Sequence, residues 1–294
     1  MVDSAIFEAQ NLFYQGAYSA CIESGRTAPS NDSGAARRLY AARAAVASGD
    51  FVTARSFIEE GPSFEAVSLL IDSLEALENG GEADFSLEKL NSLATNAPES
   101  DADVVRYCAA LAEYSAGNPE GALATLTVDG SGKCQAIECV ALGVHILLAI
   151  NRIDLAEKEF LAARKWGDDA VLVQLMEAWI ALARGGRGSQ QAFYFYDELS
   201  QTTNIANTSG VVPTLVGKAV SSAALGDINK GRESLSASVT YGDDAQVSAN
   251  TAVFNALDPA GTDDSDRVAT LSHPIATDWA AKRAELAEAI SSFA

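Results

Sequence analysis

Two cysteines, Cys134 and Cys139, lie five residues apart and are the most closely spaced thiols in the chain. A structural zinc site requires four ligands at close, paired spacings, and neither a CxxC nor an HxxxH pattern accompanies them. Cys21 and Cys108 stand alone. We therefore expect four reduced, buried thiols that behave as small apolar side chains, with no metal.

The other residues able to do chemistry are equally isolated. His145 lies among apolar neighbours, and His273 is the only other histidine. Gly185–Gly188 lacks the GxxxxGK[ST] spacing of a phosphate-binding loop, so we interpret it as a loop that lengthens one repeat. Asp263–Asp266 does not match a calcium-binding loop. No nucleophile, base and orienting group can be assembled, and the sequence predicts neither catalysis, nor a cofactor, nor a small-molecule substrate.

The elements that carry these residues belong to an acidic chain of 294 residues. Its 40 acidic and 20 basic residues give a formal net charge of −20, which disfavours direct binding to nucleic acid or to an anionic membrane. The N-terminus lacks the features of a signal peptide, and the most apolar run, 139–150, is too short to cross a bilayer. These observations predict a soluble, cytosolic protein.

A short pattern recurs along the chain: a turn residue, one spacer, a bulky apolar residue and, three further on, a small residue. The turn residues are Gly16, Gly49, Gly117, Asn151 and Gly226, with a looser copy at Gly188. The first four are separated by 33, 68 and 34 residues, and 68 is twice 34, which places a skipped copy near Ala83. A period of 34 is typical of tetratricopeptide helix pairs.

Apolar residues between the turns recur every three or four positions, as in amphipathic helices. We therefore predict an all-α fold, a single tetratricopeptide-like α-solenoid over residues 1–294, in which eight or nine helix pairs form a right-handed superhelix. Residues 275–293 are expected to form a C-terminal capping helix, and 258–274 an exposed connection. Further irregularities are expected at 78–84 and 202–212.

In a tetratricopeptide register the turn residue is position 15, and positions 2, 5, 9, 12 and 13 of the first helix face the groove. Apolar and aromatic side chains at these positions suit an apolar partner segment, and aromatic and Arg side chains usually carry interface energy. The predicted partner-binding residues are Ile6, Phe13, Tyr14, Leu39, Arg43, Tyr107, Leu111, Tyr114, His145, Leu148 and Val220.

Several stretches resemble one particular family. Ala192–Gln201 is similar to the A-[FY]-Y-x-[FY]-x-E-[LM] stretch of coatomer epsilon subunits, and Asn11–Cys21 to their N-x-F-Y-x-G-x-[YF]-x-x-C opening. Arg152–Phe160 and Ser272–Pro274 match as well. Generic tetratricopeptide proteins share the turn residues but not these aromatic residues, so the chain resembles a fungal-type member of that family.

The resemblance implies a helical superhelix that clasps the C-terminal domain of the alpha-coatomer subunit. It implies a structural role in the COPI coat, which forms vesicles for Golgi-to-endoplasmic-reticulum and intra-Golgi transport, with indirect membrane contact at the Golgi. An alternative is a scaffold or co-chaperone array that binds a peptide of another partner. Such clamps usually line their groove with Lys, Asn and Arg to hold a carboxylate.

Overall fold

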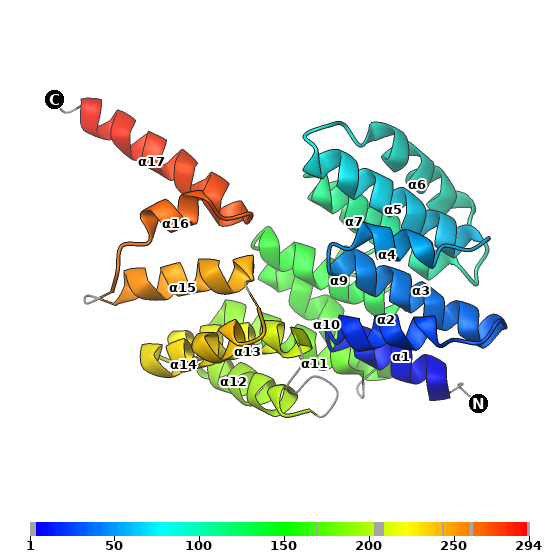
Figure 1. Cartoon of the computed structure of the whole chain (residues 1–294), viewed down its shortest axis with the longest axis horizontal. Coiled ribbons are helices and arrows are strands. Elements are labelled where there is room, and N and C mark those ends of the chain that lie inside the picture. The colour runs from blue at the N-terminus through cyan, green and yellow to red at the C-terminus, as the bar shows by residue number, and fades with distance from the viewer. Residues whose placement is uncertain (1–3, 168–169, 203–208, 243, 259–260, 293–294) are drawn as a thin grey trace. The chain divides into compact units, whose positions relative to one another are not determined.

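The computed structural model describes residues 4–167, 170–202, 209–242, 244–258 and 261–292. Over these residues all regular structure is helical (Figure 1). The chain divides into two compact units, Met1–Gly185 and Gly186–Ala294, and each is described by itself. The all-α prediction is confirmed, while a single domain over 1–294 stays a prediction.

Unit 1 consists of five helix pairs followed by the first helix of a sixth (Figure 1). Its helices are α1 (Ser4–Tyr14), α2 (Tyr18–Arg26), α3 (Asp32–Ala47), α4 (Phe51–Ser56), α5 (Pro62–Glu78), α6 (Asp84–Asn96), α7 (Ala102–Ser115), α8 (Pro119–Leu126), α9 (Ile137–Ala149), α10 (Ile153–Gly167) and α11 (Val171–Arg184).

Unit 2 contains the remaining helices (Figure 1). They are α12 (Arg187–Ser200), the short 3₁₀ turn η1 (Ser209–Val211), α13 (Val212–Ala224), α14 (Ile228–Val239), α15 (Ala245–Leu257), α16 (Ser265–Ala269) and α17 (Pro274–Ser292). The first four α-helices pack against one another in sequence, α12 on α13, α13 on α14 and α14 on α15.

The recurring turn residues end the first helix of each pair in a left-handed conformation. Gly49 has φ 74°, and even the non-glycine Asn151 has φ 60°. The next residue then bonds back to the helix, as in Asp50 N–H to Ala45 O at 2.9 Å. Asp50 also caps α4, because its side chain accepts from the N–H of Thr53. One short motif therefore closes one helix and opens the next.

The small residue five positions after each turn lies where the second helix packs against its neighbours. Cys21, Ala54, Ala122 and Ala156 are fully buried, and Gly231 is buried against the ring of Phe254. A larger side chain here would force the helices apart. The burial of these five residues therefore agrees with their predicted role in helix packing.

The structure corrects three local predictions. The turn expected at Gly188 is formed by Gly185 and Gly186, with φ 73° and 60°, and Gly188 itself lies inside α12. In the pair without a clear pattern, the left-handed residue is Gly80 rather than Ala83, which instead precedes α6. The expected connection 258–274 contains the short helix α16, whose Val268 is buried.

Two further expectations concern segments at the edge of the described residues. The predicted C-terminal helix is present as α17, but none of its residues is buried. The loop predicted for 202–212 falls largely on residues 203–208, outside the described part, and gives way to η1 and α13.

Candidate partner-binding site

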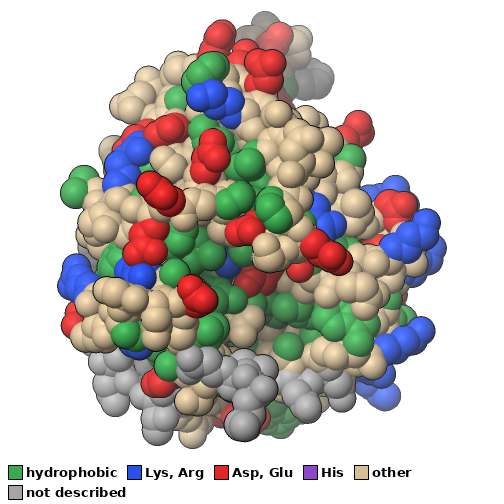
Figure 2. All heavy atoms as spheres, turned by 90° about the vertical axis from the view of Figure 1, so that its right-hand side faces the viewer, with side chains coloured by type: hydrophobic (Ala, Val, Ile, Leu, Met, Phe, Trp, Pro, Cys, Tyr) green, Lys and Arg blue, Asp and Glu red, His purple; other side chains and the backbone are tan. Residues whose placement is uncertain are grey.

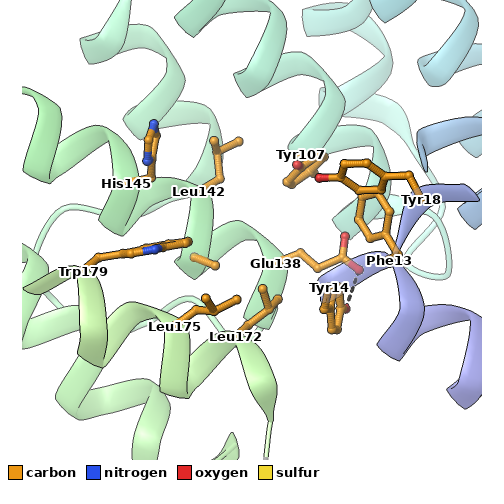
Figure 3. A pocket seen from close by; sticks show the side chains of 11 residues that line it. Phe13, Tyr14, Tyr18, Tyr107, Glu138, Leu142, His145, Leu172, Leu175 and Trp179 are labelled. Carbon is orange, nitrogen blue, oxygen red and sulfur yellow. Dashed lines mark hydrogen bonds between the residues drawn. The ribbon is translucent and has the colours of Figure 1, made fainter. Parts of the chain in front are cut away.

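A pocket of about 240 Å³ opens within unit 1, between its first and its last helices (Figure 3). One wall consists of Phe13 and Tyr14 of α1 and Tyr18 of α2. The opposite wall consists of α9 and α11, and Tyr107 of α7 lies between the two. The full lining is Phe13, Tyr14, Tyr18, Tyr107, Glu138, Ala141, Leu142, His145, Leu172, Leu175 and Trp179.

Glu138, at the start of α9, joins the two walls. Its Oε1 accepts a hydrogen bond from the hydroxyl of Tyr14 at 2.5 Å and another from Tyr40 of α3 at 3.4 Å. Its Oε2 forms an ion pair with Arg43 of α3. Since 124 residues separate Tyr14 from Glu138, the helix array of unit 1 curves far enough to bring its first helix against its fifth pair.

The surroundings keep Arg43 and Glu138 charged and the hydroxyls of Tyr14 and Tyr40 neutral. Burial alone would lower the pKa of Arg43, but Glu138 outweighs it and holds the pKa well above its usual value. Burial likewise would raise the pKa of Glu138, yet Arg43 and the tyrosine hydroxyls hold it below its usual value. Burial, and then Glu138, raise the pKa of Tyr14 well above its usual value, and the same two causes raise the pKa of Tyr40 to about 12. Both hydroxyls therefore remain protonated donors.

Three aromatic rings surround the guanidinium of Arg43. Its Cζ lies 4.7 Å from the ring centres of Phe13 and Tyr107, and 5.5 Å from that of Tyr40. Cation–π contacts are worth more when the cation is desolvated, and the Arg43 side chain is only 3% exposed. Arg43 thus does not line the pocket itself but contacts Phe13 and Tyr107, which do.

At the other end of the pocket His145 stands between two aromatic rings. Tyr114 meets it edge-on with 6.0 Å between ring centres, and Trp179 does so at 6.1 Å. Desolvation by burial lowers the pKa of His145 below its usual value, so the neutral ring is favoured. The pocket therefore offers aromatic and aliphatic surface, and Glu138, which is the only charged side chain among its described lining residues, is already paired.

The structure brings together some of the predicted binding residues and separates others. Phe13, Tyr14, Tyr107 and His145 line the pocket, and Tyr114 contacts it through His145. Arg43 is too deeply buried for direct contact with a partner. The remaining ones lie elsewhere: Leu39 and Leu111 pack on the core of α3–α7, Leu148 packs on the core of α7–α11, Ile6 is half-buried on α1, and Val220 belongs to unit 2. That any of the others contacts a partner stays a prediction.

Six lining residues with large side chains were missed, and a misplaced turn accounts for two of them, Leu172 and Trp179. The turn that follows α11 is Gly185, which lies 34 residues after Asn151, whereas the sequence pattern favoured Gly188. Counted from Gly185, the inward positions 2, 5 and 9 are Leu172, Leu175 and Trp179, all of which line the pocket. Counted from Asn151 in the same way, Glu138 is position 2 of α9, so the register could have identified it. Tyr18 and Leu142 stand outside the register.

The rest of the described chain offers little chemistry. All four cysteines are free and buried. Among the described residues, no three His, Cys, Asp or Glu side chains are grouped as a metal would require. The helices that the structure describes include none with the length and apolar character needed to span a membrane. On the face seen in Figure 2, acidic and basic side chains are interspersed.

Comparison with known proteins gives a consistent result. The sequence profile of the coatomer epsilon subunit family matches residues 2–285. Coatomer subunit epsilon-2 of rice (Oryza sativa subsp. japonica) is 30% identical over 67% of this chain, and the match spans 66% of that relative, just under two thirds of its length. Coatomer subunit epsilon-1 of rice is 28% identical over 76% of this chain and 74% of its own.

The probable coatomer subunit epsilon of Schizosaccharomyces pombe is 26% identical over 68% of this chain and 64% of its own. Plant and yeast relatives are thus comparably similar, and the fungal type stays a prediction. A tetratricopeptide repeat protein from Parabacteroides merdae shares the fold, with a TM-score of 0.54 at 11% identity, over 83% of this chain and 96% of its own. Profile, relatives and fold agree, and the chain belongs to the family of coatomer epsilon subunits.

Proposed function

We propose that this chain is a non-catalytic structural subunit of the COPI vesicle coat, and that it binds and stabilises the C-terminal domain of the alpha-coatomer subunit. Family membership supports the coat role. The observation that carries the binding role is the aromatic pocket of unit 1, whose lining is concave and mostly apolar. Concave apolar sites with a few placed polar groups are where proteins usually bind their ligands.

The lining also distinguishes this role from a carboxylate clamp. The described residues that line the pocket include neither lysine nor arginine. A terminal carboxylate placed there would face the paired carboxylate of Glu138, with no unpaired cation to receive it. An apolar segment of a folded partner would instead contact Phe13, Leu142 and Trp179. The alternative of a peptide-terminus clamp is therefore less favoured.

In this proposal the chain works on the cytosolic side of Golgi membranes and of COPI vesicles, in Golgi-to-endoplasmic-reticulum and intra-Golgi transport. Its contact with the membrane is indirect, through the other coat subunits. The net charge of −20 agrees with this, because an acidic protein gains nothing electrostatically from an anionic lipid surface.

The test is binding of the purified chain to the isolated alpha-coatomer C-terminal domain, measured by calorimetry. Trp179→Ala should raise the Kd about 30-fold or more, since truncating a central aromatic anchor typically costs about 2 kcal/mol or more. Phe85→Ala is the matched control, because Phe85 lies on α6, outside the pocket, and is 69% exposed. Binding that Trp179→Ala leaves unchanged would reject the pocket, and failure of the wild-type chain to bind would reject this partner.

A further inference from the structure

The two walls of the pocket come from opposite ends of unit 1. The first wall belongs to α1 and α2, and the second to α9 and α11. Helix α1 buries only Ala9 and Leu12, and it packs on α2 and α3 with a small contact to α11. The attachment of the first wall to the second therefore depends strongly on the polar side chains that connect them.

Glu138 is the centre of that connection. Tyr14 reaches it from α1, while Tyr40 and Arg43 reach it from α3. The amide of Gln10 donates in turn to the hydroxyl of Tyr14 at 2.7 Å, so a second α1 residue supports the same bond. A single carboxylate at the N-terminal end of α9 thus holds α1 of the first wall and also α3, on which α1 and α2 pack.

Because the ion pair between Arg43 and Glu138 is largely buried, this connection should be sensitive to a substitution of either residue. The side chain of Arg43 is 3% exposed and that of Glu138 15%. Breaking a buried pair by removing one partner is strongly unfavourable, because the remaining charge is left uncompensated. Loss of the pair should therefore separate the first wall from the second.

We propose that Glu138 is a positioning residue that sets the width of the pocket, by tying α1 and α3 to α9. This role differs from direct contact with the partner, because it acts through the bonds that both oxygens of Glu138 already make within unit 1. The effect of Glu138 on partner affinity rests on the function proposed above. Its effect on the position of α1 is independent of that function and can be measured on the free chain.

The experiment is hydrogen exchange, followed by mass spectrometry, on the free full-length chain. Glu138→Gln should raise the exchange of amides in α1 about tenfold or more and leave α5 and α6 unchanged. Tyr14→Phe keeps the ring and the ion pair but removes two hydrogen bonds, the one to Glu138 and the one from Gln10, so it should raise α1 exchange by a smaller factor. Glu59→Gln is the control, since it removes a partially exposed ion pair made by Arg38 of the same helix α3.

Unchanged α1 exchange in both variants would overturn the proposal, as would an equal rise across all helices of unit 1. Should Glu138→Gln not fold, Tyr14→Phe alone decides, because the ion pair remains. Binding to the alpha-coatomer domain then separates the two proposals. If α1 loosens but the wild-type chain does not bind, only the partner is wrong. If the wild-type chain binds and α1 exchange in the variants stays at the wild-type rate, the positioning role is wrong and the function stands.

Discussion

The pocket of unit 1 and helix α17 of unit 2 carry similar side chains in opposite situations. In the pocket, aromatic rings gather around Arg43, which is almost completely buried. On α17, Trp279, Leu286 and Ile290 are 39%, 60% and 61% exposed, and no residue of that helix is buried. Apolar residues at helical spacing therefore do not by themselves define a packed surface.

The difference lies in what holds the elements together. The walls of the pocket are joined by a charged and hydrogen-bonded cluster whose members come from three helices. Along α17 the charged contact of Lys282 is with Glu285 of the same helix. Pairs within one helix add a few tenths of a kcal/mol and fix no tertiary arrangement. The comparison teaches that the pocket should be sensitive to mutation, and α17 should not.

The largest effect is expected for Arg43→Met. It removes the cation between three rings and leaves Glu138 largely buried without its counter-ion, so the free energy of unfolding should fall by about 3–5 kcal/mol. Arg55→Met is the matched control, because Arg55 pairs with Asp72 and Glu75 at the surface and should cost about 1 kcal/mol or less. Urea titrations followed by circular dichroism measure both. Equal losses would mean that the cluster has no special role.

A second, smaller effect should come from overpacking the helix interface of unit 1. Ala156→Phe or Ala54→Phe introduces a ring where the side chain has no exposure, which should destabilise by about 1–3 kcal/mol. Glu157→Gln, next to Ala156 in sequence, removes only a surface ion pair with Arg184 and should stay within about 0.5 kcal/mol. A melt that ranks Glu157→Gln as the more damaging change would show that α10 packs differently.

The helices were predictable from sequence because the signals that begin and end them are local. Gly49 and Asp50 supply the left-handed residue and the cap within two positions, whatever the rest of the chain does. The pocket was predictable only in part. Phe13, Tyr107 and His145 follow from the register, whereas the bond between Tyr14 and Glu138 depends on the curvature of the whole array, which no local pattern encodes.

The turn after α11 shows how a small error removes part of a site. Choosing Gly188 instead of Gly185 shifts the register by three residues, and the inward positions of that helix then no longer include Trp179. Neither glycine fits the motif closely, because Arg187 and Gln190 stand two residues after Gly185 and Gly188 where the motif has a bulky apolar residue. The backbone, with φ 73° at Gly185 and a helical Gly188, assigns the turn to Gly185, in agreement with its spacing of 34 residues from Asn151.

A pH titration probes the pocket without altering its packing. Desolvation lowers the pKa of His145 in the folded chain, so the unfolded chain binds the proton first as the pH falls. Stability should therefore be independent of this group above its unfolded pKa of about 6.5 and should decrease as the pH falls below it. His145→Gln should remove this part of the pH dependence, measured as the difference between the two unfolding curves at pH 7.5 and 5.5. Parallel curves would mean that the ring is fully solvated.

The smallest effect is expected on α17. Leu286→Gln changes a side chain that is 60% exposed, so the free energy of unfolding should move by no more than about 0.5 kcal/mol. Leu147→Ala in unit 1 is the counterpart, because that side chain is 1% exposed and its truncation should cost about 2–5 kcal/mol. If Leu286→Gln instead lowers the unfolding midpoint as much as Leu147→Ala does, α17 packs against another part of the chain in solution. It would then be the capping helix that its sequence predicts, and the contrast with the pocket would no longer hold.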